Sequence, residues 1–271
     1  MVFRYSFPMQ GKLHSKSVVI VGGTSGLGLS AARAVIAEGG KVVIVGRDPQ
    51  KVEAAKNRLG DASRAVAGDA SNPTTAVEAI QTALESFGSF DGFYHVAGGS
   101  GRKMGDGPLH EITDAGWHST LNLNLTSLFN SNRAALCQFL KQGRGGSIVN
   151  CGSVLGFSPA PKFFETHAYA AAKAAIIGLT KSAAAYYAPQ NIRLNVLAPA
   201  LVATPMSQRA QGDSTLMQYI KTKQPLDGGR IGQPEDLDAA VVWLLSDQSR
   251  FVTGQVIAVD GGWSVSEGQI P

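Results

Sequence analysis

Two side chains suited to acid–base chemistry, Tyr169 and Lys173, lie four residues apart in the sequence YAAAK. The surrounding Ala-rich stretch predicts a helix, and side chains at this spacing lie on the same helical face. A free phenol has a pKa of about 10, and a neighbouring ammonium group lowers that pKa by favouring the phenolate. Tyr169 could then donate a proton to a carbonyl oxygen or remove one from an alcohol. Such pairs also occur on ordinary solvated helices, so other residues must support this interpretation.

Ser153 provides part of that support, because it follows the apolar run IVNC and precedes Tyr169 along the chain. Its hydroxyl could hydrogen-bond the same substrate oxygen and hold it about 3 Å from the phenol. Together the three side chains predict proton transfer at a carbonyl or secondary alcohol. The hydride that such a reaction needs would come from a bound cofactor.

A cofactor site is indicated where the apolar run SVVIVGG passes into the helical pattern GLSAARAV. Gly22 would allow the tight turn, Gly26 would let the backbone approach phosphates, and Gly28 would let the helix pack close to the strand. The helix N-terminus would offer unpaired N–H groups and a positive dipole end to a pyrophosphate. A glycine cluster alone is equally typical of an ordinary strand-to-helix turn.

The second apolar run ends in Gly46-Arg47, where an NAD-binding fold usually has an acid that binds the ribose hydroxyls. Without the acid, a 2′-phosphate meets no repulsion, and a guanidinium can bind it bidentately. Thr24 and Ser25 in the glycine turn could donate hydroxyls to the same phosphate. We therefore expect NADP(H) as the preferred cofactor. NAD(H) remains the alternative, with Arg47 on the adenine or in solvent and Asp48 at the ribose.

Strand-like and helix-like segments alternate along the chain, with no linker that divides it. This alternation predicts an α/β fold, a doubly wound parallel sheet with helices on both faces. We expect a single domain over residues 15–271, preceded by an N-terminal tail over residues 1–14. The expected strands are residues 17–23, 41–47, 63–71, 90–99, 145–153, 191–200 and 255–262, and the expected helices are residues 28–40, 49–60, 73–88, 113–141, 166–188 and 234–247.

Composition excludes several classes of function. The net charge is +4 with no run of Lys or Arg, which does not favour a nucleic-acid partner. No stretch approaches the roughly 20 apolar residues of a membrane span, and no secretory signal is recognisable at the start. Cys137 and Cys151 are the only cysteines, and the five histidines are dispersed, so we expect a cytoplasmic protein without a metal site.

In their order along the chain, these motifs resemble those of the short-chain dehydrogenase/reductase family, over roughly residues 15–265. VGGTSGLG is similar to the family's T-G-x-x-x-G-x-G, and YAAAK is its Y-x-x-x-K. The segments WHSTLNLNLTSLF, IVNCGSVLG, APALVATPM and VTGQVIAVDGGW resemble four further family segments. The family's N-N-A-G reads HVAG here, and we interpret His95 as a hydrogen-bonded strand-end residue rather than an acid or base.

The resemblance implies a Rossmann fold of about seven strands and a family catalytic set of Asn124, Ser153, Tyr169 and Lys173. In that set Asn124 anchors a water that links Lys173 to solvent, and Asp69 meets the adenine ring. The implied cofactor-binding residues are Gly22, Thr24, Ser25, Gly26, Leu27, Gly28, Arg47, Asp69, Ala70, Ala97, Gly98, Tyr169, Lys173, Pro199, Val202 and Thr204.

The substrate is expected to be a small alcohol or ketone, and loops are expected to form its pocket, including the segment 206–230. The candidate pocket residues are Ser153, Leu155, Phe163, Phe164, His167 and Met206.

Two other functions remain open. One is a non-catalytic NADP(H) sensor on the same fold. The other is a 3-ketoacyl-carrier-protein reductase, which would need a basic docking patch near Arg102 and Lys103. The small apolar residues of the helix at 166–188 suggest a flat packing surface. Because family members pair through this helix and the one near Asn124, we expect a homotetramer or homodimer.

Overall fold

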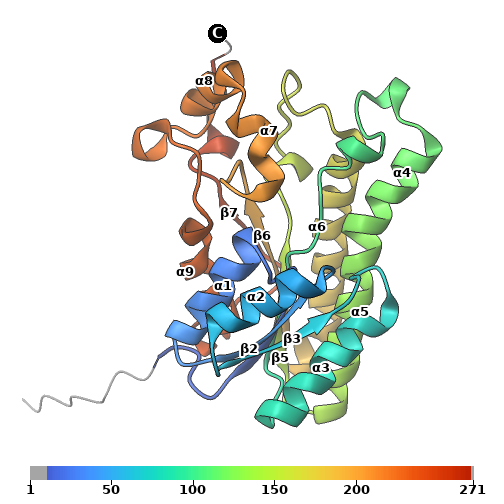
Figure 1. Ribbon diagram of the computed structural model, residues 1–271, viewed down its shortest axis with the longest axis vertical. Coiled ribbons are helices and arrows are strands. Elements are labelled where there is room, and N and C mark those ends of the chain that lie inside the picture. Colours follow the sequence, from blue (N-terminus) through green and yellow to red (C-terminus); the bar gives the residue numbers. More distant parts are fainter. Residues whose placement is uncertain (1–10, 270–271) are drawn as a thin grey trace, which may run out of the picture.

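Seven parallel strands form one sheet in the computed structural model, which describes residues 11–269 (Figure 1). The strand order is β3-β2-β1-β4-β5-β6-β7, and every neighbouring pair is parallel. The order reverses between β1 and β4, and ligands of open α/β sheets bind at the carboxyl ends of the strands at such a point. The predicted α/β sheet and its seven strands are confirmed. The strands are β1 (Ser17–Val21), β2 (Lys41–Gly46), β3 (Ser63–Ala67), β4 (Gly92–His95), β5 (Gly146–Cys151), β6 (Ile192–Pro199) and β7 (Val256–Val259).

Helices cover both faces of the sheet because strand side chains alternate between them. In β1, Val18 and Ile20 join the apolar cluster under α1 (Gly26–Ala37), α2 (Pro49–Leu59) and α9 (Asp238–Leu245). The other face carries a second apolar cluster built with β1 residues Val19 and Val21. Figure 1 shows the two layers of helices on opposite sides of the sheet. The second layer consists of α3 (Pro73–Phe87), α4 (Asp114–Leu121), α5 (Ser127–Gln142) and α6 (His167–Tyr187).

The segment after β6 forms a small cap at one end of the sheet, at the top of Figure 1. It contains α7 (Gln208–Gln211) and α8 (Ser214–Lys223). A third apolar cluster lies under this cap, with Leu216, Tyr219 and Trp263 almost completely buried.

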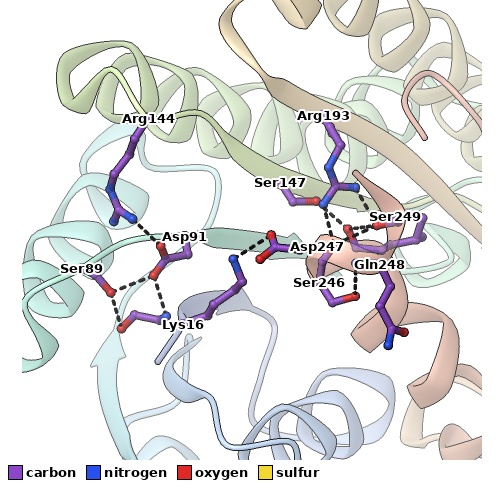
Figure 2. Close-up of polar contacts among 12 residues, drawn as sticks. Lys16, Ser89, Asp91, Arg144, Ser147, Arg193, Ser246, Asp247, Gln248 and Ser249 are labelled. Atoms are coloured by element: carbon purple, nitrogen blue, oxygen red, sulfur yellow. Dashed lines mark hydrogen bonds and ion pairs between the residues drawn. The ribbon is translucent and has the colours of Figure 1, made fainter. Parts of the chain in front are cut away.

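The opposite end of the sheet, where the strands begin, is closed by polar contacts between distant segments (Figure 2). Lys16 pairs with Asp247 at 2.9 Å, and Arg144 pairs with Asp91 at 2.7 Å. Arg193, at the start of β6, donates to the hydroxyl of Ser249 at 2.8 Å.

The structure differs from the predicted elements in several places: every strand is shorter than predicted, and α7 and α8 were not among the expected helices. The helix expected over residues 113–141 is interrupted by a π-helical turn at Asn122–Thr126 between α4 and α5. β3 ends at Ala67, and β4 spans only Gly92–His95, so both strands are shorter than predicted. Residues 1–10 of the predicted tail lie outside the described residues. Leu13 within that tail is fully buried, so packing begins before residue 15.

Candidate active site

A cleft of about 470 Å³ lies where β1, β2 and β4 end, at the reversal of strand order. Most of the predicted cofactor-binding residues line it, from the glycine turn, the ends of β2 and β4 and the segment after β6. Those residues are Gly22, Thr24, Ser25, Gly26, Leu27, Gly28, Arg47, Asp69, Ala70, Ala97, Gly98 and Thr204. Four other residues predicted for this site, Pro199, Val202, Tyr169 and Lys173, do not line the cleft.

The glycine turn has the geometry that close phosphate approach requires. Gly22 and Gly26 have φ values of +96° and +49°, a region that other residues rarely adopt. A Cβ on Gly28 would lie 2.2 Å from the carbonyl oxygen of Gly22, so only glycine lets α1 pack this close. Ser25, the N-cap of α1, makes no side-chain cap, and the first turn of α1 contains no acid. The residues therefore fit a dinucleotide phosphate bound at the start of α1.

Arg47 and Asp69 both line the cleft, where they follow the neighbouring strands β2 and β3. Asp69 accepts hydrogen bonds from the amide and hydroxyl of Ser71 at 2.8 and 2.7 Å. These bonds hold the pKa of Asp69 below its usual value, and the positive charge of Arg47 acts in the same direction. Arg47 itself is exposed, so its guanidinium is accessible to a ligand in the cleft.

The four predicted catalytic residues are all buried, with 0–9% of each residue exposed. Ser153 lies beside the phenol of Tyr169, and its side chain acts to lower the pKa of that phenol. Lys173 Nζ donates to the Cys151 carbonyl oxygen at 2.8 Å and lies 5.5 Å from the centre of the Tyr169 ring. The end of β5 and the first turns of α6 therefore bring Ser153, Tyr169 and Lys173 together.

Asn124 lies in the π-helical turn, and its side chain is fully paired with backbone groups. Its amide nitrogen donates to the carbonyl oxygens of Gly99 and Thr120, both at 2.9 Å, and its oxygen accepts from the Gly99 amide at 3.1 Å. A Cβ on Gly98 would lie 2.7 Å from this oxygen and 3.8 Å from Lys173 Nζ. The side chains of Asn124 and Lys173 therefore both lie next to Gly98.

The expected effect of Lys173 on the Tyr169 pKa was wrong for this structure. Burial raises the pKa of Tyr169, and the hydrogen bond with Ser153 only partly opposes this effect. Burial also lowers the pKa of Lys173. The ammonium of Lys173 donates to the Cys151 carbonyl oxygen, and desolvation of the phenol rather than the lysine charge sets the direction of the Tyr169 pKa.

His95, at the end of β4, is a structural residue, as we interpreted it. Its Nδ1 lies 3.0 Å from Ser131 Oγ, and its Nε2 lies 3.4 Å from Ser127 Oγ. Burial lowers the pKa of His95 to about 3, so the imidazole is neutral near pH 7. It therefore replaces the family asparagine as a hydrogen-bonding group.

The predicted substrate residues other than Ser153 lie in three different places. Phe163, Phe164 and Leu155 pack onto the apolar cluster under α8, and the Phe163 ring lies 5.0 Å from that of Tyr219. Met206 instead lines the cofactor cleft and is 56% exposed. His167 begins α6 and is exposed, with Nδ1 3.1 Å from the Gly107 carbonyl oxygen. The residues that do not line the cleft are Leu155, Phe163, Phe164 and His167.

Sequence reasoning missed several cleft residues on the helical stretch around Asn124. Ser119, Leu123 and Ser127 recur every four residues and all line the cleft, so helical periodicity could have placed them on one face. Gly68, Ser71, Val96, Met104, Asn122 and Pro205 also line it without a comparable sequence signal. Among residues 11–269, no group of His, Cys, Asp or Glu side chains could hold a metal ion. No helix in the same range is long and apolar enough to span a membrane.

Comparison with known proteins agrees with this geometry. A family model described as enoyl-(acyl carrier protein) reductase matches residues 21–264. The chain is 36% identical to 2-(S)-hydroxypropyl-CoM dehydrogenase 3 of Xanthobacter autotrophicus, over 94% of this chain and 98% of that protein. It is 34% identical to the NADP-dependent (R)-specific alcohol dehydrogenase of Lentilactobacillus kefiri, over 94% and 99% of the two chains.

Among solved structures, a short-chain type dehydrogenase/reductase from Mycobacterium ulcerans superposes with a TM-score of 0.86 at 30% identity. The match covers 94% of this chain and 92% of that one. The chain therefore belongs to the short-chain dehydrogenase/reductase family and is an oxidoreductase that acts on CH–OH groups.

Proposed function

We propose that this protein transfers hydride between NADP(H) and a small carbonyl or secondary alcohol substrate, with Tyr169 as the acid and base. The observation that carries the proposal is the burial of Tyr169 and Ser153 side by side, with the Lys173 ammonium 5.5 Å from the centre of the Tyr169 ring. Two neighbouring hydroxyls can bind one substrate oxygen, and one of them can exchange a proton with it.

Each catalytic side chain has a separate task in this mechanism. Ser153 holds the substrate oxygen against the phenol, and Tyr169 donates its proton to that oxygen during carbonyl reduction. A nicotinamide cofactor, when bound, would supply or accept the hydride. Because burial keeps the phenol protonated near neutral pH, the structure favours Tyr169 as a proton donor. Lys173, which donates to the Cys151 carbonyl oxygen, is proposed to contact the cofactor, and Asn124 supports the adjacent loop at Gly98 and Gly99.

The preference for NADP(H) rests on the end of β2. Arg47 lines the cleft, and the preceding Gly46 brings no negative charge to it. Asp48, the alternative ribose ligand, instead caps α2, since its Oδ1 accepts from the amides of Gln50 and Lys51 at 2.9 and 3.3 Å. The NADP dependence in the name of the Lentilactobacillus relative supports the same choice.

The carrier-protein alternative receives little support from its proposed docking residues. Arg102 donates to the Phe163 carbonyl oxygen at 3.1 Å and pairs with Glu165 at 3.6 Å. Its charge is therefore already paired within this chain, and the exposed Lys103 is the other basic residue proposed for a docking patch. The sensor alternative is less economical, because a sensor has no need of the full catalytic set.

Assembly and location belong to the same proposal. α5 exposes Phe129 and Leu140, and α6 exposes Tyr186 at 73%, so these helices offer apolar surface to a second copy. We infer a homodimer or homotetramer built through them, in the cytoplasm, where the exposed Cys137 stays reduced.

The test is a panel of ketones and aldehydes with NADPH and with NADH, followed by Tyr169→Phe on the best substrate. The variant keeps the ring but loses the proton, so turnover should fall by about 10²–10⁴-fold while NADPH still binds. NADPH binding without oxidation across the whole panel would favour the sensor. Near wild-type turnover of Tyr169→Phe would remove Tyr169 from the mechanism.

A further inference from the structure

The first turn of α6, which contains Tyr169, is capped by a residue from a distant loop. Asp106 lies after β4, and only 6% of it is exposed. Its Oδ1 accepts from the Ala168 amide at 3.0 Å, and its Oδ2 accepts from the Tyr169 amide at 2.9 Å. Thr166, the local N-cap of α6, makes no side-chain cap, and the first turn has no acid of its own. Asp106 therefore satisfies N–H groups that a local N-cap would ordinarily serve.

Asp106 is itself held firmly by its neighbours. Its amide donates to the Gly101 carbonyl oxygen at 3.2 Å. The following residue, Gly107, accepts from the His167 amide at 3.5 Å. The loop therefore accepts hydrogen bonds from the start of α6 through the Asp106 side chain and the Gly107 carbonyl group.

The same loop, residues 99–107, also holds Asn124. It begins at Gly99, whose amide and carbonyl groups both pair with the Asn124 side chain. Gly101 has φ +73°, and a Cβ there would meet Thr120 Oγ1 at 2.3 Å and Asp106 Cβ at 2.9 Å. The loop is thus packed between the helical stretch of Asn124 and the first turn of α6. The single segment 99–107 therefore contacts both Asn124 and the backbone of Tyr169.

We propose that Asp106 is a positioning residue, which holds the Tyr169 phenol in register with Ser153 by anchoring the backbone of Tyr169. The proposal rests on the proposed role of Tyr169 as the acid and base. A side chain that starts from a displaced backbone carries its hydroxyl with it, and a displacement of about 1 Å can cost about 10²-fold in rate. The carboxylate also meets the positive end of the α6 dipole, which strengthens the anchor.

The experiment compares Asp106→Ala and Asp106→Asn with the matched control Asn72→Ala. Asn72 caps α3, where its Oδ1 accepts from the Thr74 amide at 3.1 Å, and α3 carries no residue of the proposed site. For each variant we would measure kcat, KM for the carbonyl substrate, NADPH affinity and stoichiometry by fluorescence, and the melting temperature. Asp106 does not line the cofactor cleft, so NADPH affinity and one-to-one stoichiometry should be retained.

We expect Asp106→Ala to lower kcat by about 10–100-fold. Asp106→Asn, which keeps one acceptor oxygen, should recover part of that loss. Asn72→Ala should lower the melting temperature and leave kcat unchanged. The NADPH stoichiometry gives the concentration of folded sites. Because kcat is calculated per folded site, an unfolded fraction cannot lower it. Wild-type kcat in Asp106→Ala, despite a lowered melting temperature, would overturn the proposal.

The result also separates this inference from the function on which it rests. If Tyr169→Phe loses turnover and Asp106→Ala does not, only the positioning role fails. If neither substitution changes turnover, the proposed acid–base role of Tyr169 fails first.

Discussion

Gly46 lies directly against Thr24, so that a Cβ on Gly46 would come within 2.4 Å of Thr24 Cγ2 and 3.0 Å of its Oγ1. The end of β2 is therefore closed to any larger side chain as long as Thr24 keeps its place. An acid that could bind ribose hydroxyls cannot occupy position 46 unless the Thr24 side chain moves. The contact thus links the missing acid to the turn that is proposed to bind phosphate.

Gly46→Ala should destabilise the protein through this contact. A buried methyl group forced into a packed site costs about 1–3 kcal/mol of unfolding free energy. Thr24→Ser removes Cγ2, so the double variant should recover part of the loss, with a coupling of about 0.5–3 kcal/mol. Urea unfolding of the two single variants and the double variant measures the coupling. Strictly additive effects would show that the two residues do not meet in solution.

Arg47→Asp should shift cofactor choice toward NADH. The substitution removes a charge-assisted hydrogen bond to the 2′-phosphate and adds repulsion, so NADPH binding should weaken by about 1–3 kcal/mol. Affinities for both cofactors, measured by fluorescence titration, test this. Arg58→Asp on exposed α2 makes the same charge change outside the cleft and serves as the control. An unchanged NADPH affinity in Arg47→Asp would exclude its role at the phosphate.

The pH dependence of carbonyl reduction should follow the raised pKa of Tyr169. The reactive form is the protonated phenol, which persists at every pH below that raised pKa, so kcat should stay level through neutral pH and fall only in alkali. The hydrogen bond with Ser153 lowers this pKa, so Ser153→Ala should move the alkaline fall to higher pH. Pre-steady-state rates measured across the pH range locate the alkaline fall in rate. Ser158→Ala, which changes a nearby serine, serves as the control. Movement to lower pH would contradict the assignment.

Stability in acid should depend on His95. Its pKa is about 3 in the fold against an ordinary value of about 6.5, so the unfolded chain binds the proton more tightly. The neutral imidazole therefore makes its full contribution to the free energy of unfolding above pH ~6.5. This contribution is lost as the pH falls toward 3. The loss at pH 5 is about 2 kcal/mol. Urea unfolding of His95→Asn between pH 7 and 5 should show a shallower decline than wild type.

His118→Asn on exposed α4 is the control for that series. Because the substitution at residue 95 also changes packing, the slope with pH carries the argument rather than the absolute stability. Parallel curves for wild type and His95→Asn would show that the buried imidazole does not control acid stability.

Much of the fold follows from local sequence patterns alone. Apolar runs of strand length alternate with helical periodicity, and parallel sheets need such crossover helices between strands, so the sequence determined the sheet and its two helical layers. Glycine positions determined the turn before α1 for the same local reason, since Gly22 and Gly26 have positive φ values. The helical spacing of Tyr169 and Lys173 likewise placed both residues on α6.

Tertiary structure alone decided how those residues are surrounded. The Tyr169 pKa is raised by burial within the whole fold, which the local spacing of Tyr169 and Lys173 does not reveal. Asp106 lies 63 residues before Tyr169 in the sequence and accepts from its amide in the first turn of α6. A local sequence pattern cannot predict a helix cap at that separation. Phe163 and Phe164 pack with α8 and Trp263 because the chain folds back after β6, a contact between distant segments. Periodicity reports neighbours within one element, whereas desolvation and long-range hydrogen bonds arise only when the elements pack together.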